Sequence, residues 1–455
     1  MPTLDEPRSP GRKLLTAILV GLALSIPLFA VWLLVYDRQG QHEEALTSIA
    51  EGWGGPQVMR GPVLVIPYKQ TRTETDNENG KAVARTRVVD MELTLDPATI
   101  DIGSKVKPEL RPRSIYQGVV YTSTTHGAAR FALPDNLASF GVDPATLDLS
   151  RSELRFGVSD QRGLGTNPVV SVAGKSVRLQ PGVGSGQGGG FFAFIDASSL
   201  RGGSTVVVFD YDLKGSQSLA LEPRGGDIHW RVDSAWPHPS FVGNFLPGSR
   251  SVSDKGFVAD YRIGNLSLGR TLVSTDARGD SSLVSSQTNT TEAEIAPAIA
   301  TVTLIQPVDL YSRVDRAVKY GFLFIGFTFL ALLMFDVIGG IAVSSVEYLL
   351  MGAALVLFFV LLLAFAEVIG FGLAYVVASA AIAGLNTAYS AAVLGGWKRG
   401  YLIGGLLIGL YAALYVLLGL EALSLLIGSV MLFLALAAIM FVTRRINWGG
   451  TVVPE

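Results

Sequence analysis

Hydrophobic residues gather in two regions of the chain, residues 14–36 and residues 322–442, while the stretch between them has the mixed composition of a water-soluble domain. Leu14–Tyr36 is an uncharged run that is long enough to cross roughly 30 Å of hydrocarbon. Trp32 and Tyr36 lie at its far end, as in an interfacial aromatic belt, and no small-residue cleavage site follows. The pattern therefore predicts an uncleaved transmembrane anchor.

The second region divides into five runs, each near the length that a tilted transmembrane helix needs. These runs are Phe322–Ile338, Tyr348–Ala366, Val368–Leu394, Tyr401–Gly419 and Ala422–Val442. Six transmembrane helices are predicted in total, one N-terminal and five C-terminal.

Basic residues set the expected orientation. Arg12 and Lys13 precede the first run, and with that end inside, Lys398–Arg399 and Arg444–Arg445 also fall on the cytoplasmic side, as the positive-inside rule requires. Both termini are therefore predicted to be cytoplasmic, in a bacterial inner membrane.

Three basic residues fall on the opposite side in this arrangement. Arg313, Arg316 and Lys319 follow a long translocated domain, and such domains cross largely regardless of charge. An apolar stripe lies opposite them, so the segment resembles an interfacial helix that leads into the membrane. The stripe consists of Val308, Tyr311, Val314 and Val318.

The intervening region carries the period-two alternation of half-buried strands at residues 89–95 and 207–213. Helix formers at Gln39–Glu51 predict that the first helix continues outward before the strands begin. Shorter apolar runs separated by Gly, Pro and Asp predict an antiparallel sandwich or two stacked sheets. They lie at 63–68, 115–122, 153–158, 169–172 and 177–179, and the composition of Pro181–Gly190 predicts a loop.

The predicted fold class is an α+β membrane protein with a large β-rich extracytoplasmic domain inserted after the first of six transmembrane helices. The predicted parts are a cytoplasmic tail at 1–13, a transmembrane helix at 14–36, a periplasmic domain at 37–319, a five-helix cluster at 320–442 and a cytoplasmic tail at 443–455.

The composition limits the partners and the kinds of chemical site that we expect. The formal net charge is −2, and no clustered basic face indicates nucleic acid as a partner. The chain has no cysteine, which excludes disulfides and thiolate chemistry, and its four histidines show no paired zinc-ligand spacing. We therefore expect no metal site and no cofactor, and membrane lipids as partners, with another envelope protein as a further possibility.

Ionisable residues in the membrane region are the strongest functional candidates, because each is costly in hydrocarbon. Glu367 stands out, and a site for a lipid or small amphiphile would combine it with Tyr375 and Asn386. For Asn386, an interhelical hydrogen bond is favoured over binding a ligand. The basic residues Arg313, Arg316 and Lys319, together with Glu421, are expected where the exported domain meets the membrane. For Glu421, Asp336 and Glu347, a helix-end position or an ion pair is the simpler interpretation.

One further segment combines prolines, aromatic rings and a histidine. In Trp236, Pro237, His238, Pro239 and Phe241 the prolines fix the backbone and the rings supply apolar walls. A rigid corner that packs on the sheet is favoured over a catalytic histidine, because no partner residue can be identified.

Several segments resemble the CreD family of inner-membrane proteins, in the same order along nearly the whole chain. They are Trp53–Tyr68, Leu110–Tyr121, Ser234–Pro247, Arg313–Phe329 and Leu361–Tyr375. The resemblance implies the architecture described above and a role in cell-envelope integrity and the envelope-stress response, with no established catalytic residues. This chain departs from the family at Ser344–Tyr348, where members tend to have His-Pro-x-Gln-Tyr, and at Asp336, where a Glu is common.

Three functions follow as hypotheses. The first is a non-enzymatic inner-membrane protein that supports envelope integrity, with the periplasmic domain binding an envelope partner or lipid. The second is a lipid or amphiphile carrier with a site in the helix cluster. The third is a membrane-bound hydrolase or transferase at the outer leaflet, with His238 and the acids above the membrane as first suspects.

Overall fold

The computed structural model describes residues 10–419, except 79–80, 115, 186–188, 276–297, 306–309 and 338–342, together with scattered residues between 426 and 444. The chain divides into two compact units. The helix unit contains residues 1–43 and 308–455, and the sandwich unit contains residues 44–307. Residues 37–43 and 308–319, which the hydropathy pattern assigns to the exported domain, therefore belong to the helix unit.

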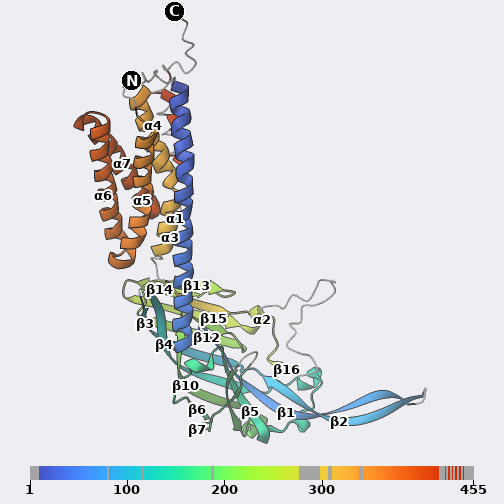
Figure 1. Cartoon of the computed structure of the whole chain (residues 1–455). Helices are drawn as coiled ribbons and strands as arrows, with labels where there is room; N and C mark the ends of the chain where they lie inside the picture. The colour runs from blue at the N-terminus through green and yellow to red at the C-terminus, as the bar shows by residue number, and fades with distance from the viewer. Residues whose placement is uncertain are drawn as a thin grey trace, which may run out of the picture. The chain divides into compact units, whose positions relative to one another are not determined.

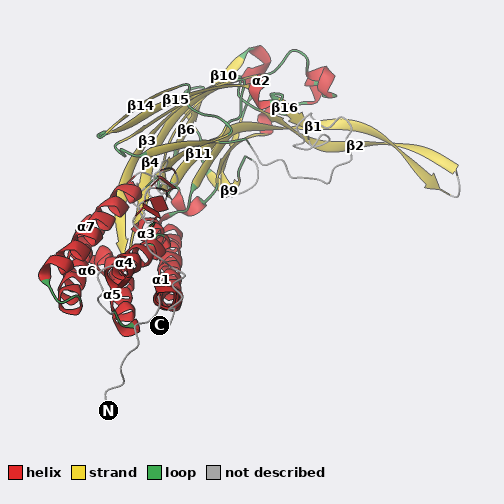
Figure 2. Cartoon of the chain, turned by 90° about the horizontal axis from the view of Figure 1, so that it is seen from above, coloured by secondary structure: helices red, strands yellow, loops and turns green. Residues whose placement is uncertain are grey.

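The helices are α1 (Pro10–Trp53), α2 (Asn265–Leu268), α3 (Leu310–Lys319), α4 (Gly321–Val337), α5 (Ser345–Ile369), α6 (Phe371–Val393) and α7 (Trp397–Gly419). Figure 1 and Figure 2 show α4, α5, α6 and α7 side by side with the first part of α1. Within the helix unit, α5 packs against α6, α6 against α7, and the short α3 against α4, α5 and α7.

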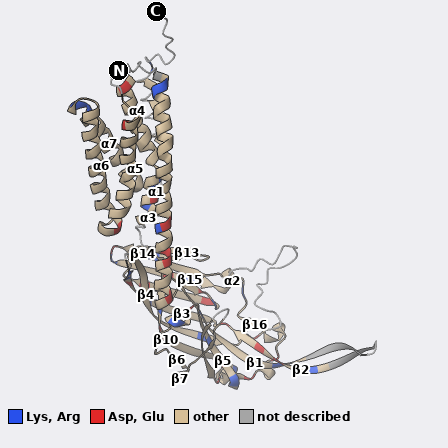
Figure 3. Ribbon diagram, in the orientation of Figure 1, with Lys and Arg blue, Asp and Glu red and all other residues tan. Residues whose placement is uncertain are grey.

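Five helical segments of the described chain are long and apolar enough to cross a membrane, and one of them joins α3 to α4. The prediction of six was one more than the structure describes. The missing one, residues 422–442, lies largely outside the described residues, although those described within it are helical. Figure 3 shows that charged residues are sparse along α4 to α7 and gather near the helix ends, as expected for helices solvated by lipid.

The prediction that the first helix continues past the membrane is confirmed, because α1 is unbroken from Pro10 to Trp53. It ends where Gly54 adopts a φ of 129°, a conformation that favours glycine. The Trp53 indole donates to the carbonyl oxygen of Tyr121 at 3.1 Å, and the Arg111 guanidinium lies 3.7 Å from its ring centroid. These contacts tie the last turn of α1 to the sheets of the sandwich unit.

The described part of the sandwich unit contains seventeen strands in two sheets. The strands are β1 (Gln57–Glu78), β2 (Lys81–Leu95), β3 (Thr99–Arg113), β4 (Tyr116–Ala132), β5 (Ser152–Val158), β6 (Val169–Val172), β7 (Lys175–Ser176), β8 (Gln180–Val183), β9 (Gly189–Ile195), β10 (Ser204–Ser216), β11 (Ser218–Glu222), β12 (Asp227–Ser234), β13 (Pro239–Gly243), β14 (Ser249–Ser253), β15 (Gly256–Gly264), β16 (Val273–Thr275) and β17 (Ala300–Leu304).

The nine-stranded sheet runs in the order β13-β17-β11-β1-β5-β9-β8, with β2 and β16 attached through β1, and the eight-stranded sheet in the order β14-β15-β12-β3-β4-β10-β6-β7. Their inner faces share one hydrophobic core, in which Phe156 of the first sheet meets Phe209 of the second edge to face at 5.4 Å. The predicted sandwich is thus confirmed. The pairing is mostly antiparallel, but β1 with β11 and β3 with β12 are parallel.

Two local predictions were wrong. Residues 177–179 do not form a strand, because β7 ends at Ser176 and β8 begins at Gln180. The Gly-rich segment Pro181–Gly190 is not a simple loop, since its ends form the hairpin of β8 and β9. Glycine is needed there for close approach: a Cβ on Gly190 would overlap the carbonyl oxygen of Phe156.

Candidate functional site

Asp336, near the C-terminal end of α4, is neutralised by Lys13 of α1. The Lys13 Nζ atom lies 2.7 Å from Asp336 Oδ1 and donates to the Asp336 carbonyl oxygen at 3.1 Å. The Asp336 side chain is only 4% exposed, so it has little contact with solvent and Lys13 is its charged partner. The pair fastens the N-terminal turns of α1 to the end of α4.

Glu367, near the end of α5, is held by two other helices. It accepts a hydrogen bond from the Tyr311 hydroxyl of α3 at 3.2 Å, and the Arg38 Nε atom of α1 lies 4.0 Å from the same Oε1 atom. The His42 ring lies 5.5 Å from the Tyr311 ring. Glu367 therefore joins α1, α3 and α5.

These two contacts bracket the hydrocarbon-spanning part of α1. Lys13 and Arg38 are about 38 Å apart along the helix axis at 1.5 Å per residue, which slightly exceeds a hydrocarbon core of about 30 Å. Each ion pair thus lies near a membrane interface, where a charged side chain costs less than at the bilayer centre.

The basic residues of α3 have separate contacts. The Arg313 guanidinium lies 5.5 Å from the Phe371 ring centroid of α6, and Lys319 pairs with Asp315 at 2.6 Å. The Trp32 indole of α1 donates to Asp315 at 3.0 Å. The Arg316 Nε atom donates to the Ser312 carbonyl oxygen at 3.4 Å. Glu421, the fourth predicted junction residue, lies outside the described residues.

The apolar stripe of α3 is buried among helices. Tyr311, Val314 and Val318 are at most 5% exposed, and Ala317 is fully buried beside them. Because α3 packs against α4, α5 and α7, this face contacts protein. The fourth residue of the predicted stripe, Val308, lies outside the described residues.

A groove of about 1020 Å³ runs between α6 and α7. Its floor contains small residues, among them Ala383, Gly384 and Gly405, and aromatic rings stand toward its two ends. The lining residues are Tyr375, Val376, Ser379, Ala380, Ala383, Gly384, Thr387, Ala388, Trp397, Tyr401, Gly404, Gly405, Ile408, Tyr411, Ala412, Tyr415 and Val416. The groove is therefore apolar, with a few hydroxyl groups along it.

Glycines explain the shape of this groove. A Cβ on Gly400 would lie 2.7 Å from the Ala391 Cβ, and one on Gly404 would overlap the Thr387 side chain, so the two helices touch closely near their connecting turn. Beyond that contact, a Cβ on Gly384 or Gly405 would meet nothing within 4 Å. The absent side chains leave an open channel along the outer surface of the helix pair.

The structure brings only one of the three predicted ligand residues to this groove. Tyr375 lines it, and its hydroxyl donates to the Tyr411 carbonyl oxygen at 2.7 Å. Glu367 is engaged by Tyr311 and Arg38 instead. Asn386 is 1% exposed, and its Nδ2 atom has no hydrogen-bond partner among the described residues.

The floor of the groove was not identified from the sequence. Its signal is the spacing of small residues at Ala380, Gly384 and Ala388 on α6, together with Gly405 on α7. Such spacing puts small residues on one face of a transmembrane helix. The sequence alone does not say whether a helix or a lipid covers that face.

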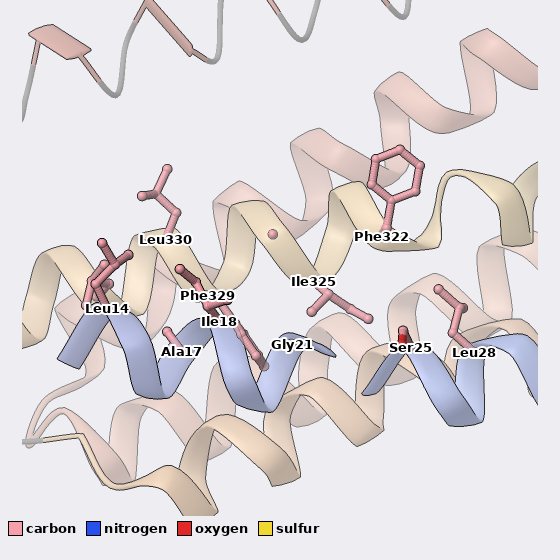
Figure 4. Close-up of a pocket in the computed structure, with 12 residues that line it drawn as sticks. Leu14, Ala17, Ile18, Gly21, Ser25, Leu28, Phe322, Ile325, Phe329 and Leu330 are labelled. Atoms are coloured by element: carbon pink, nitrogen blue, oxygen red, sulfur yellow. The ribbon is translucent and has the colours of Figure 1, made fainter. Parts of the chain in front are cut away.

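A smaller hollow of about 260 Å³ lies between α1 and α4. Figure 4 shows Leu14, Ala17, Gly21 and Ser25 of α1 facing Phe329 and other apolar residues of α4 across it. This hollow contains no charged side chain. Apart from the Ser25 hydroxyl, its lining is apolar.

The proline-rich segment of the sandwich unit makes structural contacts. The Trp236 indole donates to the Ile305 carbonyl oxygen at 2.9 Å, and the His238 carbonyl oxygen accepts from the Ile305 amide at 3.2 Å. Phe241 packs edge to face on Phe257 at 5.7 Å. The segment connects β12 of one sheet to β13 of the other. Among the described residues, no group of three His, Asp or Glu side chains could hold a metal ion.

Comparison with known proteins gives a single consistent result along the chain. The family model described as inner membrane protein CreD matches residues 9–449. The inner membrane protein CreD of Escherichia coli (strain K12) is 32% identical over 435 residues, which cover 95% of this chain and 92% of that protein. A solved M1 zinc metallopeptidase from Deinococcus radiodurans aligns with a TM-score of 0.20 and 12% identity, over 37% of this chain and 38% of that one, which supports no conclusion.

Proposed function

Because the chain belongs to the CreD family of inner-membrane proteins, we propose that it supports cell-envelope integrity without catalysing a reaction, and that its helix unit binds a membrane lipid. The sandwich unit lies on the periplasmic side in this proposal and binds an envelope partner or lipid, and both termini are cytoplasmic. The positive-inside distribution of Lys13, Lys398, Arg399 and Arg444 supports that orientation.

The α6–α7 groove is the observation that carries the lipid-binding part. Its lining is largely apolar, and the small residues of its floor leave room for a chain of methylene groups. From Tyr401 to Tyr415 it extends about 21 Å at 1.5 Å per residue, which is more than one leaflet of an about 30 Å core. A lipid acyl chain can therefore lie in it along its length.

The ion pairs of α1 support a structural role for the polar residues of the helix unit. Asp336, which is buried, and Glu367, which is half-buried, each have a basic partner on α1. A paired carboxylate that holds helices together has less freedom to act as a general acid or base. We therefore assign these residues to the assembly of the unit.

A groove-filling substitution tests the proposal in cells and in vitro. Gly405 lines the groove and Gly409 does not, yet a Cβ at either position meets nothing within 4 Å. Gly405→Leu and Gly409→Leu therefore add the same side-chain volume to α7. The first adds it inside the groove and the second outside it. The purified variants and the unmodified protein are compared by native mass spectrometry for retained phospholipid. The genes of both variants are then tested for complementation of a deletion strain under detergent, β-lactam and osmotic stress.

We expect Gly405→Leu to lose retained lipid and to complement poorly, while Gly409→Leu behaves as the unmodified protein. If the deletion strain shows no sensitivity to any of the three stresses, the envelope role is wrong. If Gly405→Leu retains as much lipid as Gly409→Leu, the groove does not bind lipid.

A further inference from the structure

The two helices that form the groove have an unusual charge distribution. Between Phe371 and Gly419 the sequence contains no acidic residue and two basic ones, Lys398 and Arg399. Both stand in the first turn of α7, and both are exposed. The positive charge of this helix pair is therefore confined to one end of the groove.

Aromatic residues mark the same end. Trp397 and Tyr401 line the groove, are 60% and 65% exposed, and have ring centroids 5.7 Å apart. Such rings sit at the headgroup level of a bilayer. The first turn of α7 thus lies at an interface, with its basic side chains among lipid phosphates.

Arg399 and Lys398 differ in whether their side chains are engaged within the protein. The Arg399 Nη1 atom donates to the Leu394 carbonyl oxygen at 2.6 Å and so caps the C-terminal end of α6. Lys398 directly follows Trp397, and its exposed ammonium group can reach the headgroup region while its stem covers apolar surface. Lys398 does not itself line the groove, but Trp397 beside it does, so the exposed ammonium group belongs to the helical turn at which the groove ends.

From this juxtaposition we infer that the groove selects an anionic phospholipid, with its phosphate at Lys398 and an acyl chain along Gly384, Gly405 and Ile408. The inference rests on the lipid binding proposed above and specifies the lipid class and its orientation. A zwitterionic lipid fills the same apolar channel but gains less at the Lys398 end, since its headgroup carries no net charge.

A transmembrane helix from a partner is the competing occupant, and the shape of the groove disfavours it. Close helix packing is favoured by small residues at the contact, as at Ala380, Gly384 and Ala388 of α6. Here Gly400 and Gly404 are already used between α6 and α7, and the large rings of Trp397, Tyr401 and Tyr415 project at the two ends. A flexible chain passes between such rings more easily than a helical backbone does.

The test uses the full-length protein in nanodiscs made from equal parts of phosphatidylglycerol and phosphatidylcholine. Lipids that remain bound after extraction are counted by native mass spectrometry. Lys398→Gln removes the charge, and Lys319→Gln, a lysine on α3 that pairs with Asp315, is the matched control. Gly405→Leu fills the channel.

We expect the unmodified protein and Lys319→Gln to retain phosphatidylglycerol in preference to phosphatidylcholine. One basic side chain near the membrane surface corresponds to a preference of about fivefold, which Lys398→Gln should abolish while total lipid is unchanged. Gly405→Leu should reduce both lipids.

Other outcomes separate the two proposals. Equal retention of both lipids by the unmodified protein, lost in Gly405→Leu, would overturn the anionic preference and leave the lipid groove standing. Retention that Gly405→Leu does not change would overturn both. A co-purified membrane protein that Gly405→Leu alone displaces would identify a helix as the occupant and overturn the lipid assignment.

Discussion

The sandwich unit and the helix unit bury polar groups in different ways. In the sandwich, Gln57 is fully buried and its side chain donates to the backbone oxygens of Asp160 and Lys214 at 3.1 and 3.0 Å. In the helix unit, α1 forms ion pairs with neighbouring helices, as Lys13 does with Asp336 of α4. The sandwich also contains a buried ion pair between strands, since the Arg60 Nε atom of β1 lies 2.6 Å from Glu222 Oε2 of β11. Buried amides such as Gln57 thus act beside ion pairs in the sandwich, whereas the two acids Asp336 and Glu367 of the helix unit each lie near a basic residue of α1.

The solvent explains the difference. A sheet exposes many backbone groups at its edges and turns, and a buried amide can satisfy several of them at once. A transmembrane helix satisfies its own backbone, so its side chains have few polar partners and a charge needs another charge. Polar contacts of the sandwich are therefore numerous and include both neutral and charged groups, whereas those among the described membrane helices are few and costly to break.

The largest effect is expected from breaking the Lys13–Asp336 pair. Lys13→Leu leaves a nearly buried carboxylate without its cation, which we expect to cost about 4 kcal/mol of unfolding free energy. Asp336→Leu should cost less, because the Lys13 side chain is 22% exposed and can turn toward the interface. Unfolding in mixed micelles measures both.

The double variant sharpens this prediction. If charge pairing is what matters, Lys13→Leu combined with Asp336→Leu should recover most of the stability lost in Lys13→Leu alone. An additive loss in the double variant would show that the two side chains contribute independently.

A smaller effect is expected from glycines in tight contacts, and it should differ between the units. Gly190→Ala places a methyl group against the Phe156 carbonyl oxygen, a backbone atom in the middle of β5, and should cost about 3 kcal/mol. Gly352→Ala on α5 meets the side-chain tips of Leu24 and Phe329, which can shift, and gains helix propensity. We expect the second change to be nearly neutral in the same unfolding measurement, and a loss as large as that of Gly190→Ala would contradict this explanation.

The smallest effect concerns pH and the sandwich. Asp160 accepts hydrogen bonds from the Arg162 side chain and from the amides of Arg162 and Gly55, and its interaction with Arg162, chiefly the side-chain hydrogen bond, lowers the pKa of this carboxyl. A lowered pKa in the folded state means that the stabilisation is complete above the unfolded value and is lost as pH falls through the folded value. Asp160→Asn should remove this dependence and cost about 1 kcal/mol near neutral pH, as a lost cap does.

Thermal unfolding of the full-length protein, followed by tryptophan fluorescence between neutral and acidic pH, tests the Asp160 prediction. Asp160 caps the 3-10 helix Gln161–Gly163 through the Arg162 amide. Asp143→Asn is a suitable control, because Asp143 caps the 3-10 helix Pro144–Thr146 through the Ala145 amide. Parallel pH curves for Asp160→Asn and the unmodified protein would rule out Asp160 as a source of the dependence.

The sequence predicted the large-scale organisation because solvation acts on composition over many residues. An uncharged run such as Leu14–Tyr36 has few alternatives to a membrane helix, and the alternation at residues 207–213 needs a half-buried strand, now seen as β10. Short irregular segments were harder: the Gly-rich hairpin of β8 and β9 depends on contacts with Phe156, which is distant in sequence.

The candidate site, too, was predicted only in part from the sequence. From the sequence alone, Glu367 and Asp336 could be recognised as costly in lipid and the first turn of α7 as basic, since these are properties of single residues in a known solvent. Which partners neutralise the acids, and which face of α6 and α7 stays open, are pairwise properties of segments far apart in the chain. Only the tertiary structure decided them, because packing sets the groove between Gly384 and Gly405 and brings Lys13 to Asp336.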